Sequence, residues 1–236
     1  MRIHSRAAFI IWKLIIIIAG VIALLAQSNI LRGSVSPLMF HYFAPLLCIA
    51  IIIDSLIELI YTAQGGHERR LALPGLKHSL MICSVLVVYF SAAILNLSIN
   101  TYSGFENVPF LIFHYLMPIL VVVDWLLFDP KGTAHMWAPF LYPLPAAIYL
   151  VVVELAVNVF STNTAGIFLL SGAGTFPYPL FDITLSGLSS VILLAVLCYI
   201  LMVAFGFVIA ALDNLMKPRK AAVYGTSRRA SHAHQS

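Results

Sequence analysis

A histidine, a proline and an aspartate lie inside one long apolar stretch of this chain. His114, Pro118 and Asp124 fall within residues 108–128, which are otherwise almost entirely apolar. Ionisable side chains are costly in hydrocarbon, so an intramembrane position marks them as functional candidates. An imidazole there can act as a general base or a metal ligand when a partner holds one ring nitrogen. This stretch is therefore the first place to look for a site.

The composition of the whole chain is that of an integral membrane protein. Of its 236 residues, 61% are hydrophobic and 9% are charged, against roughly 25% charged residues in soluble domains. Runs long enough to cross the ~30 Å hydrocarbon core are residues 8–28, 37–61, 76–97, 108–128, 137–160 and 185–216. We expect an all-α, polytopic fold: a six-transmembrane-helix bundle over residues 1–216, followed by a basic tail, 217–236.

The basic residues predict the orientation of this bundle. Of the 13 Lys and Arg, only Arg32 falls on the far side if both termini share a compartment. The positive-inside rule then predicts that both termini are cytoplasmic. The first stretch also has the basic and apolar regions of a signal peptide, so cleavage stays an alternative. The tail is expected to contact anionic membrane lipids and not nucleic acid.

A rise of ~1.5 Å per residue sorts the intramembrane polar residues into two layers. His41, His114 and Glu154 lie within ~10 Å of the outer boundary. The loop of residues 171–182 is predicted to cover this outer layer. Its catalytic candidates are His114 as base with Glu154 or Asp182 as the group that orients it. Its ligand-binding candidates are His41, Tyr42, Asn96, Tyr115, Asn158 and Tyr178.

Two prolines strengthen the case for the histidines. A proline within a helix leaves the carbonyl four residues earlier without its usual donor, and Pro45 and Pro118 do so for His41 and His114. Each histidine is thus expected beside a free acceptor at a kink. The plainer interpretation is that each histidine hydrogen-bonds with its neighbouring tyrosine at the interface. No H-x-x-x-H or H-E-x-x-H spacing occurs, so no metal site and no cofactor are predicted.

The inner layer lies near the cytoplasmic side and consists of Lys13, Asp54, Glu58 and Asp124, with Asp213 at the same level. Asp124 follows His114 by ten residues, or ~15 Å of helix, so the two cannot pair directly. Asp54 and Glu58 are four residues apart and repel each other unless one is protonated or a cation such as Lys13 intervenes. Interhelical hydrogen bonding is the plain interpretation of this layer, and a transport pathway is the alternative.

Two segments resemble a bacterial family of six-span membrane proteins. They are Phe-His-Tyr-Leu-Met-Pro-Ile-Leu at 113–120, continuing through Asp124 to the Asp-Pro-Lys-Gly turn at 129–132, and Phe-Pro-Tyr-Pro-Leu-Phe-Asp at 176–182, with Tyr142-Pro143 between them. That family is similar to the eukaryotic androgen-induced-gene and androgen-dependent TFPI-regulating proteins. The resemblance covers about residues 40–215.

The resemblance implies a membrane threonine hydrolase that cleaves fatty-acid esters of hydroxy fatty acids, with a threonine in span two and a histidine in span four. His114 matches the histidine, and Asp124 an acidic residue of the family. Span two has Ala44, and residues 42–48 contain no Thr or Ser where the family has its threonine, so the nucleophile does not carry over. Without a hydroxyl there is no covalent route. The substitutes are Ser98, Thr101, Ser103 and Cys48.

These observations favour a lipid-handling protein related to the six-span hydrolases, with an acyl ester as its ligand. It is either a hydrolase or a variant that binds the ester without cleaving it. A small proton-coupled carrier that uses the intramembrane carboxylates is the first alternative. A structural partner of another membrane protein is the second. The sequence leaves the oligomeric state open.

Overall fold

The computed structural model describes residues 3, 5–30, 33, 42–64, 74–94, 107–158 and 178–217. All regular elements in these ranges are helical. In chain order they are α1 (Arg6–Gln27), α2 (Phe43–Ala63), α3 (Pro74–Tyr89), η3 (Phe90–Ile94), α4 (Asn107–Leu111), η6 (Ile112–Leu116), α5 (Met117–Phe128), η7 (Ala138–Phe140), α6 (Leu144–Asn158), η8 (Pro179–Phe181), α7 (Ile183–Ser186) and α8 (Leu188–Leu215).

Six helical segments are long and apolar enough to cross a membrane: Arg6–Gln27, Phe43–Ala63, Gly75–Ala92, Val108–Phe128, Ala138–Leu155 and Leu188–Leu215. The predicted bundle of six transmembrane helices is confirmed, and the chain is a multi-pass membrane protein. The second helix begins at Phe43 and not at Pro37, because Tyr42 has an extended backbone with φ −88° and ψ 142°. Residues 34–41, which include His41, lie outside the described part.

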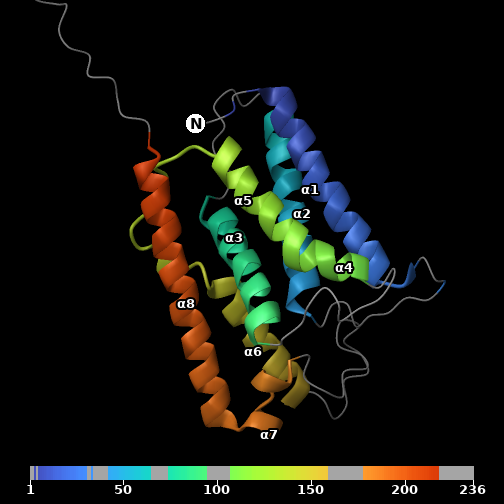
Figure 1. Cartoon of the computed structure of the whole chain (residues 1–236), viewed down its shortest axis with the longest axis vertical. Helices are drawn as coiled ribbons and strands as arrows, with labels where there is room; N and C mark the ends of the chain where they lie inside the picture. Colours follow the sequence, from blue (N-terminus) through green and yellow to red (C-terminus); the bar gives the residue numbers. More distant parts are fainter. Residues whose placement is uncertain are drawn as a thin grey trace, which may run out of the picture.

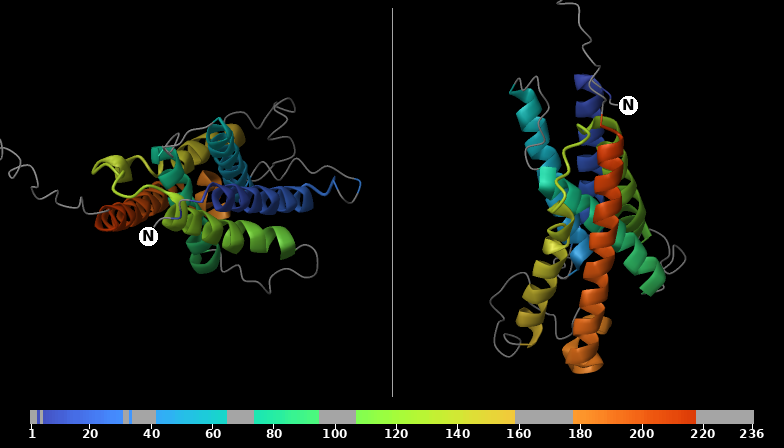
Figure 2. Two further views of the ribbon diagram at one scale, coloured as in Figure 1. Left: turned by 90° about the horizontal axis from the view of Figure 1, so that it is seen from above. Right: turned by 90° about the vertical axis from the view of Figure 1, so that its left-hand side faces the viewer.

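The bundle is organised around α3, which contacts α2, α5, α6 and α8. Helix α1 packs against α2, α4 and α5 on one side of it, and α8 forms the opposite edge (Figure 1). The start of α1 and the end of α8 lie at the same end of the bundle, as two views show (Figures 1 and 2). The end that carries Arg6 and Lys217 is called the basic end below, and the other is the far end.

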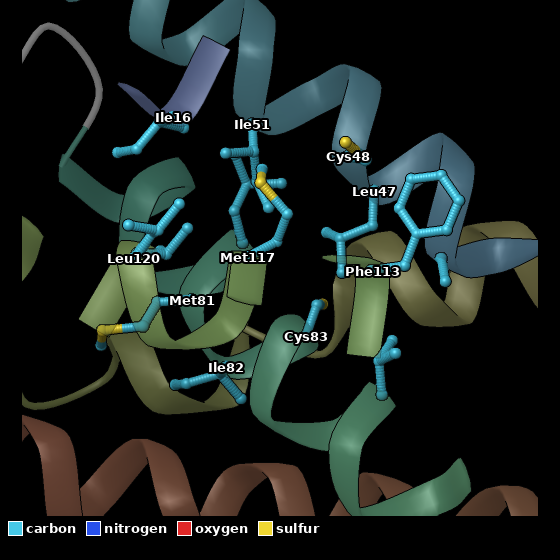
Figure 3. Packing of buried hydrophobic residues seen from close by; sticks show 14 of the residues in the cluster. Ile16, Leu47, Cys48, Ile51, Met81, Ile82, Cys83, Phe113, Met117 and Leu120 are labelled. Carbon is cyan, nitrogen blue, oxygen red and sulfur yellow. The ribbon is translucent and has the colours of Figure 1, made fainter. Parts of the chain in front are cut away.

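The core lies where α1, α2, α3 and α5 meet. Its buried side chains are mostly aliphatic and sulfur-containing, among them Ile51, Met81 and Met117 (Figure 3). Gly20 lets α1 approach α2 closely: a Cβ there would lie 2.8 Å from Ile52 Cδ1. Small residues at such contacts are typical of helix pairs in membranes, where close approach supplies the attraction. The first helix is therefore an integral part of the bundle.

Two of the spans contain a π-helical turn. In the third span it is η3, and in the fourth it is η6, where the Met117 N–H bonds to the Ile112 carbonyl, five residues back. Figure 1 shows the fourth span changing direction between α4 and α5. Pro118 is the second residue after η6 and has no N–H, so a wider turn before it accommodates the missing bond. Pro45 instead lies in the first turn of α2, where no kink is needed.

Candidate functional site

The far half of the bundle contains an apolar cavity of about 420 Å³ between α2, α3, α6 and α8. Both π-helical turns contribute to its wall: Phe90 and Ser91 from η3, and His114 from η6. Its lining is mostly apolar, and its polar side chains are Ser91, His114, Tyr149, Tyr178 and Tyr199, with the Cys198 thiol. An apolar cavity with a few polar groups is the usual form of a small-molecule site.

His114 is half-buried, and its own helix holds its ring in place. Nδ1 lies 3.0 Å from the Phe110 carbonyl oxygen, and the His114 and Phe110 rings are tilted by 30° with their centroids 4.5 Å apart. A carbonyl can only accept, so Nδ1 must carry the hydrogen. In the neutral imidazole Nε2 is then the acceptor. His114 thus has the tautomer that a hydrogen-bond acceptor or general base requires.

Tyr178 joins the loop before α7 to this cavity. Its hydroxyl oxygen accepts a hydrogen bond from the Phe43 N–H at 3.2 Å. Its ring packs edge-on against Tyr42 and Phe90, with centroid distances of 6.0 and 5.9 Å. Burial raises the pKa of Tyr178, so its phenol stays neutral. Together with Phe181 it forms the described part of the predicted cover, of which residues 171–177 lie outside the described chain.

The structure does not bring the other catalytic candidates to His114. Asp182 caps α7, its Oδ1 accepting from the Thr184 N–H at 2.8 Å and the Thr184 hydroxyl at 2.5 Å. Glu154 is half-buried on α6 and is not among the residues that line the cavity. A role for either carboxylate beside His114 stays a prediction.

Some of the predicted ligand-binding residues lie at or near the cavity, and others lie outside the described part of the chain. Tyr178 lines the cavity, Tyr42 touches Tyr178, and the Tyr115 ring packs edge-on against Phe110 at 6.0 Å. Other predicted residues lie outside the described part of the chain: His41, Asn96, the Asn158 side chain, Ser98, Thr101 and Ser103. Cys48 is buried in the core against Gly20 and is not in the cavity wall.

The inner layer forms a closed ring of ion pairs at the basic end. Lys13 Nζ contacts Glu58 Oε2 and lies 2.6 Å from Asp124 Oδ2. Lys77 Nζ lies 2.6 Å from the same Asp124 oxygen and 3.3 Å from Glu58 Oε1. All four side chains are at most 8% exposed, and their formal charges cancel. Each charge is therefore compensated where water cannot screen it.

Two further carboxyl groups adjoin this ring. Asp129 Oδ1 accepts a hydrogen bond from Lys77 Nζ at 2.5 Å, so Lys77 serves three carboxylates. Asp54 lies one helical turn before Glu58 on the buried face of α2. Burial raises the pKa of Asp129 from 3.8 to about 7; the charges of Asp124 and Glu58 also raise it, and Lys77 lowers it. We call these six residues the ion-pair network.

Sequence reasoning missed three residues of these sites. Lys77 is in the first turn of an apolar span, where a lysine usually extends to the surface, yet it is 4% exposed. Asp129 precedes Pro130 in what reads as a surface turn. Ser91 is one serine among many apolar neighbours. The signal available for Lys77 and Asp129 was the excess of carboxylates over cations in the inner layer.

Asp213 was predicted at the level of the network. It accepts hydrogen bonds from the loop between α5 and η7 instead. Its Oδ2 accepts from the Thr133 and Ala134 N–H groups at 2.8 and 3.0 Å, and its carbonyl accepts from the Gly132 N–H at 3.1 Å. Gly132 has φ +75° and packs against Lys217. These bonds join the basic ends of α5 and α8.

Nothing outside the chain itself narrows the choice of function. No group of three or more His, Cys, Asp or Glu within the described ranges could hold a metal ion. No family model, curated protein or solved structure matches the chain. The cavity and the ion-pair network are therefore the two candidate sites that the geometry offers.

Proposed function

We propose that the protein binds an acyl lipid ester within the membrane, with the acyl chain in the apolar cavity and the ester group near His114. The observation that carries this proposal is the cavity, whose size falls within the ~300–1,000 Å³ range of small-molecule sites. Its few polar groups are an unprotonated ring nitrogen, the hydroxyls of one serine and three tyrosines, and a thiol; these can bind an ester or hydroxyl group but do not suit a charged solute.

The π-helical turns support the same location. Such turns are rare and occur frequently at functional sites. Here one lies in each of two spans, and both contribute to one cavity wall. We also propose that the chain is related to the six-span hydrolase-like family that it resembles. The proposal also includes a bacterial inner membrane with both termini cytoplasmic, supported by the gathering of Arg6, Lys13, Lys77, Lys131 and Lys217 toward the basic end.

Filling the cavity tests the proposal. A pyrene-labelled fatty-acid ester is titrated into the purified protein in detergent, and binding is followed by fluorescence. Ala147→Trp places an indole in the cavity wall and is expected to weaken binding at least about tenfold. The control is Ala211→Trp, an exposed position on α8 outside the lining. Equal affinities in the two variants would refute binding in this cavity.

Ester cleavage is the second candidate function, favoured by the presence of Ser91 and His114 in one cavity wall. The Ser91 hydroxyl would attack the ester carbonyl while His114 Nε2 takes its proton, giving an acyl-serine and releasing the alcohol; water then frees the fatty acid. Ser91 Oγ now donates to the Val88 carbonyl at 3.0 Å and must rotate first.

A fluorophosphonate probe tests cleavage directly. Labelling is expected at Ser91, lost in Ser91→Ala and strongly reduced in His114→Ala. Ser84→Ala is the matched control, because this serine bonds to the Leu80 carbonyl in the same helix and does not line the cavity. Labelling that persists in Ser91→Ala would rule out Ser91, and the protein would then bind the ester without this route to cleavage.

A further inference from the structure

The ion-pair network holds more acid than base. Its ring is neutral, with Lys13 and Lys77 balancing Glu58 and Asp124. Asp129 then adds a third carboxyl group to a lysine whose charge is already balanced. Its side chain is 3% exposed, so water cannot stabilise a further negative charge there. Something positive must accompany this carboxyl group.

The positive charge can be accommodated at the second carboxyl oxygen of Asp129. Oδ1 is occupied by Lys77, whereas Oδ2 is fully buried with no hydrogen-bond partner among the described residues. An ionised carboxylate oxygen in that position would be desolvated and uncompensated. A carboxyl oxygen that carries a proton does not have this cost.

We propose that Asp129 is a proton-binding site, in which an exchangeable proton on its carboxyl group keeps the Lys77 end of the ion-pair network neutral. A proton fits better than a metal ion, because no group of carboxylates in the described part of the chain has metal-binding geometry. When the proton leaves for water at the basic end, Lys77 faces three anions. The site does not depend on the ligand proposed for the cavity.

Asp129 also lies where several elements meet. It follows α5 directly, and Lys77 links it to α3. The neighbouring Leu127 carbonyl accepts from the Ile3 N–H at 2.8 Å, so the start of the chain is attached here too. A charge that appears at Asp129 therefore acts on the contact between α3 and α5, the two spans that carry the π-helical turns.

The other charged or titratable side chains described near the basic end interact elsewhere. Lys131 donates to the Trp125 carbonyl, Arg6 donates to the Thr62 carbonyl, and Asp213 accepts from the loop. His78 packs against Tyr142 with a centroid distance of 5.8 Å. The charged groups that act on Asp129 are Lys77, Asp124 and Glu58, all members of the network.

Infrared difference spectroscopy on the full-length protein in detergent tests the site. The carbonyl band of a protonated carboxyl group should fall about tenfold between about pH 6 and about pH 8, with its midpoint at about 7. Asp129→Asn removes this titrating band. Asp54→Asn, which removes the other carboxyl group outside the ring, leaves it in place.

Substituting glutamate keeps the test decisive if Asp129→Asn does not fold. Asp129→Glu retains a carboxyl group and should shift both the frequency and the midpoint of the band. The proposal is overturned if the titrating band is unchanged in the Asn or Glu variant, if it disappears only in Asp54→Asn, or if no band titrates in this range. None of these results bears on lipid binding, which is measured separately.

Discussion

The two halves of the bundle differ in how their buried polar side chains are arranged. In the basic half, lysines and carboxylates from four helices compensate one another inside the protein, and the helices between them are regular. In the far half, π-helical turns interrupt two spans, and polar groups line an apolar cavity. The first arrangement holds helices together, whereas the second leaves room for a ligand. Stability and binding should therefore respond to different substitutions.

The largest expected effect is at Lys77. Lys77→Met leaves Glu58, Asp124 and Asp129 without their shared cation, and breaking a buried pair in this way costs about 3–5 kcal/mol. Thermal unfolding in detergent measures the loss. Lys131→Met is the control: it loses a partly exposed contact with Trp125, at a cost of roughly 1 kcal/mol or less. Similar melting temperatures for the two variants would contradict a structural role for the ring.

A double substitution separates the ion pair from its individual charges. Lys13→Met alone leaves Asp124 with Lys77 only, and Asp124→Leu alone leaves Lys13 with Glu58 only. Lys13→Met combined with Asp124→Leu removes one charge of each sign, and should be more stable than either single variant by about 1–3 kcal/mol. A double-mutant cycle in chemical denaturation checks this. Strictly additive losses would show that the two charges act independently.

The pH dependence of stability sharpens the comparison further. The pKa of Asp129 is raised from 3.8 to about 7, so the folded protein binds more protons than the unfolded chain between these values. Its contribution to stability is therefore complete below about pH 4 and lost as the pH rises to about 7, by up to about 1.4 kcal/mol per pH unit. The unfolding free energy of Asp129→Asn, measured alongside the unaltered protein, should lack this fall. Parallel pH profiles would contradict the assignment.

The smallest expected effect on stability is at His114. Among the described residues, its ring bonds to the carbonyl of its own helix alone, so His114→Phe should cost less than about 1 kcal/mol in unfolding. Binding of the labelled ester should weaken in the same variant because the acceptor nitrogen is gone. Unfolding and ester titration on one preparation give both values. A large loss of stability with unchanged binding would reverse the roles assigned to the two halves.

The sequence predicted the bundle well because hydropathy alone determines it. Six apolar runs gave six helices, and helical rise separated His114 from Asp124 correctly, since one lines the cavity and the other belongs to the ring. Lys13 does contact Glu58, which is one of the two alternatives that the repulsion between Asp54 and Glu58 left open. These inferences depended only on spacing within a helix or on charge balance.

The rest of the site depends on contacts between helices, which spacing does not reveal. Lys77 looked like a surface lysine because only the approach of α2 and α5 buries it. Ser91 reaches the cavity through a π-helical turn, whose extra residue changes the face on which later side chains lie. Depth grouped Asp182 with His114, but depth does not say where a side chain points, and Asp182 caps a helix.

The π-helical turn at Ile112–Leu116 divides the fourth span into two helices, α4 and α5, that run in different directions. Each residue turns an α-helix by ~100°, so a single inserted residue sets the rotational phase of the far half relative to the basic half. Deleting one residue of this turn would leave Asp124 and the ring in register while rotating His114 toward a different neighbour. The side chains that the fourth span presents to the cavity can thus be changed by inserting or deleting single residues, without disturbing the charges that hold the bundle together.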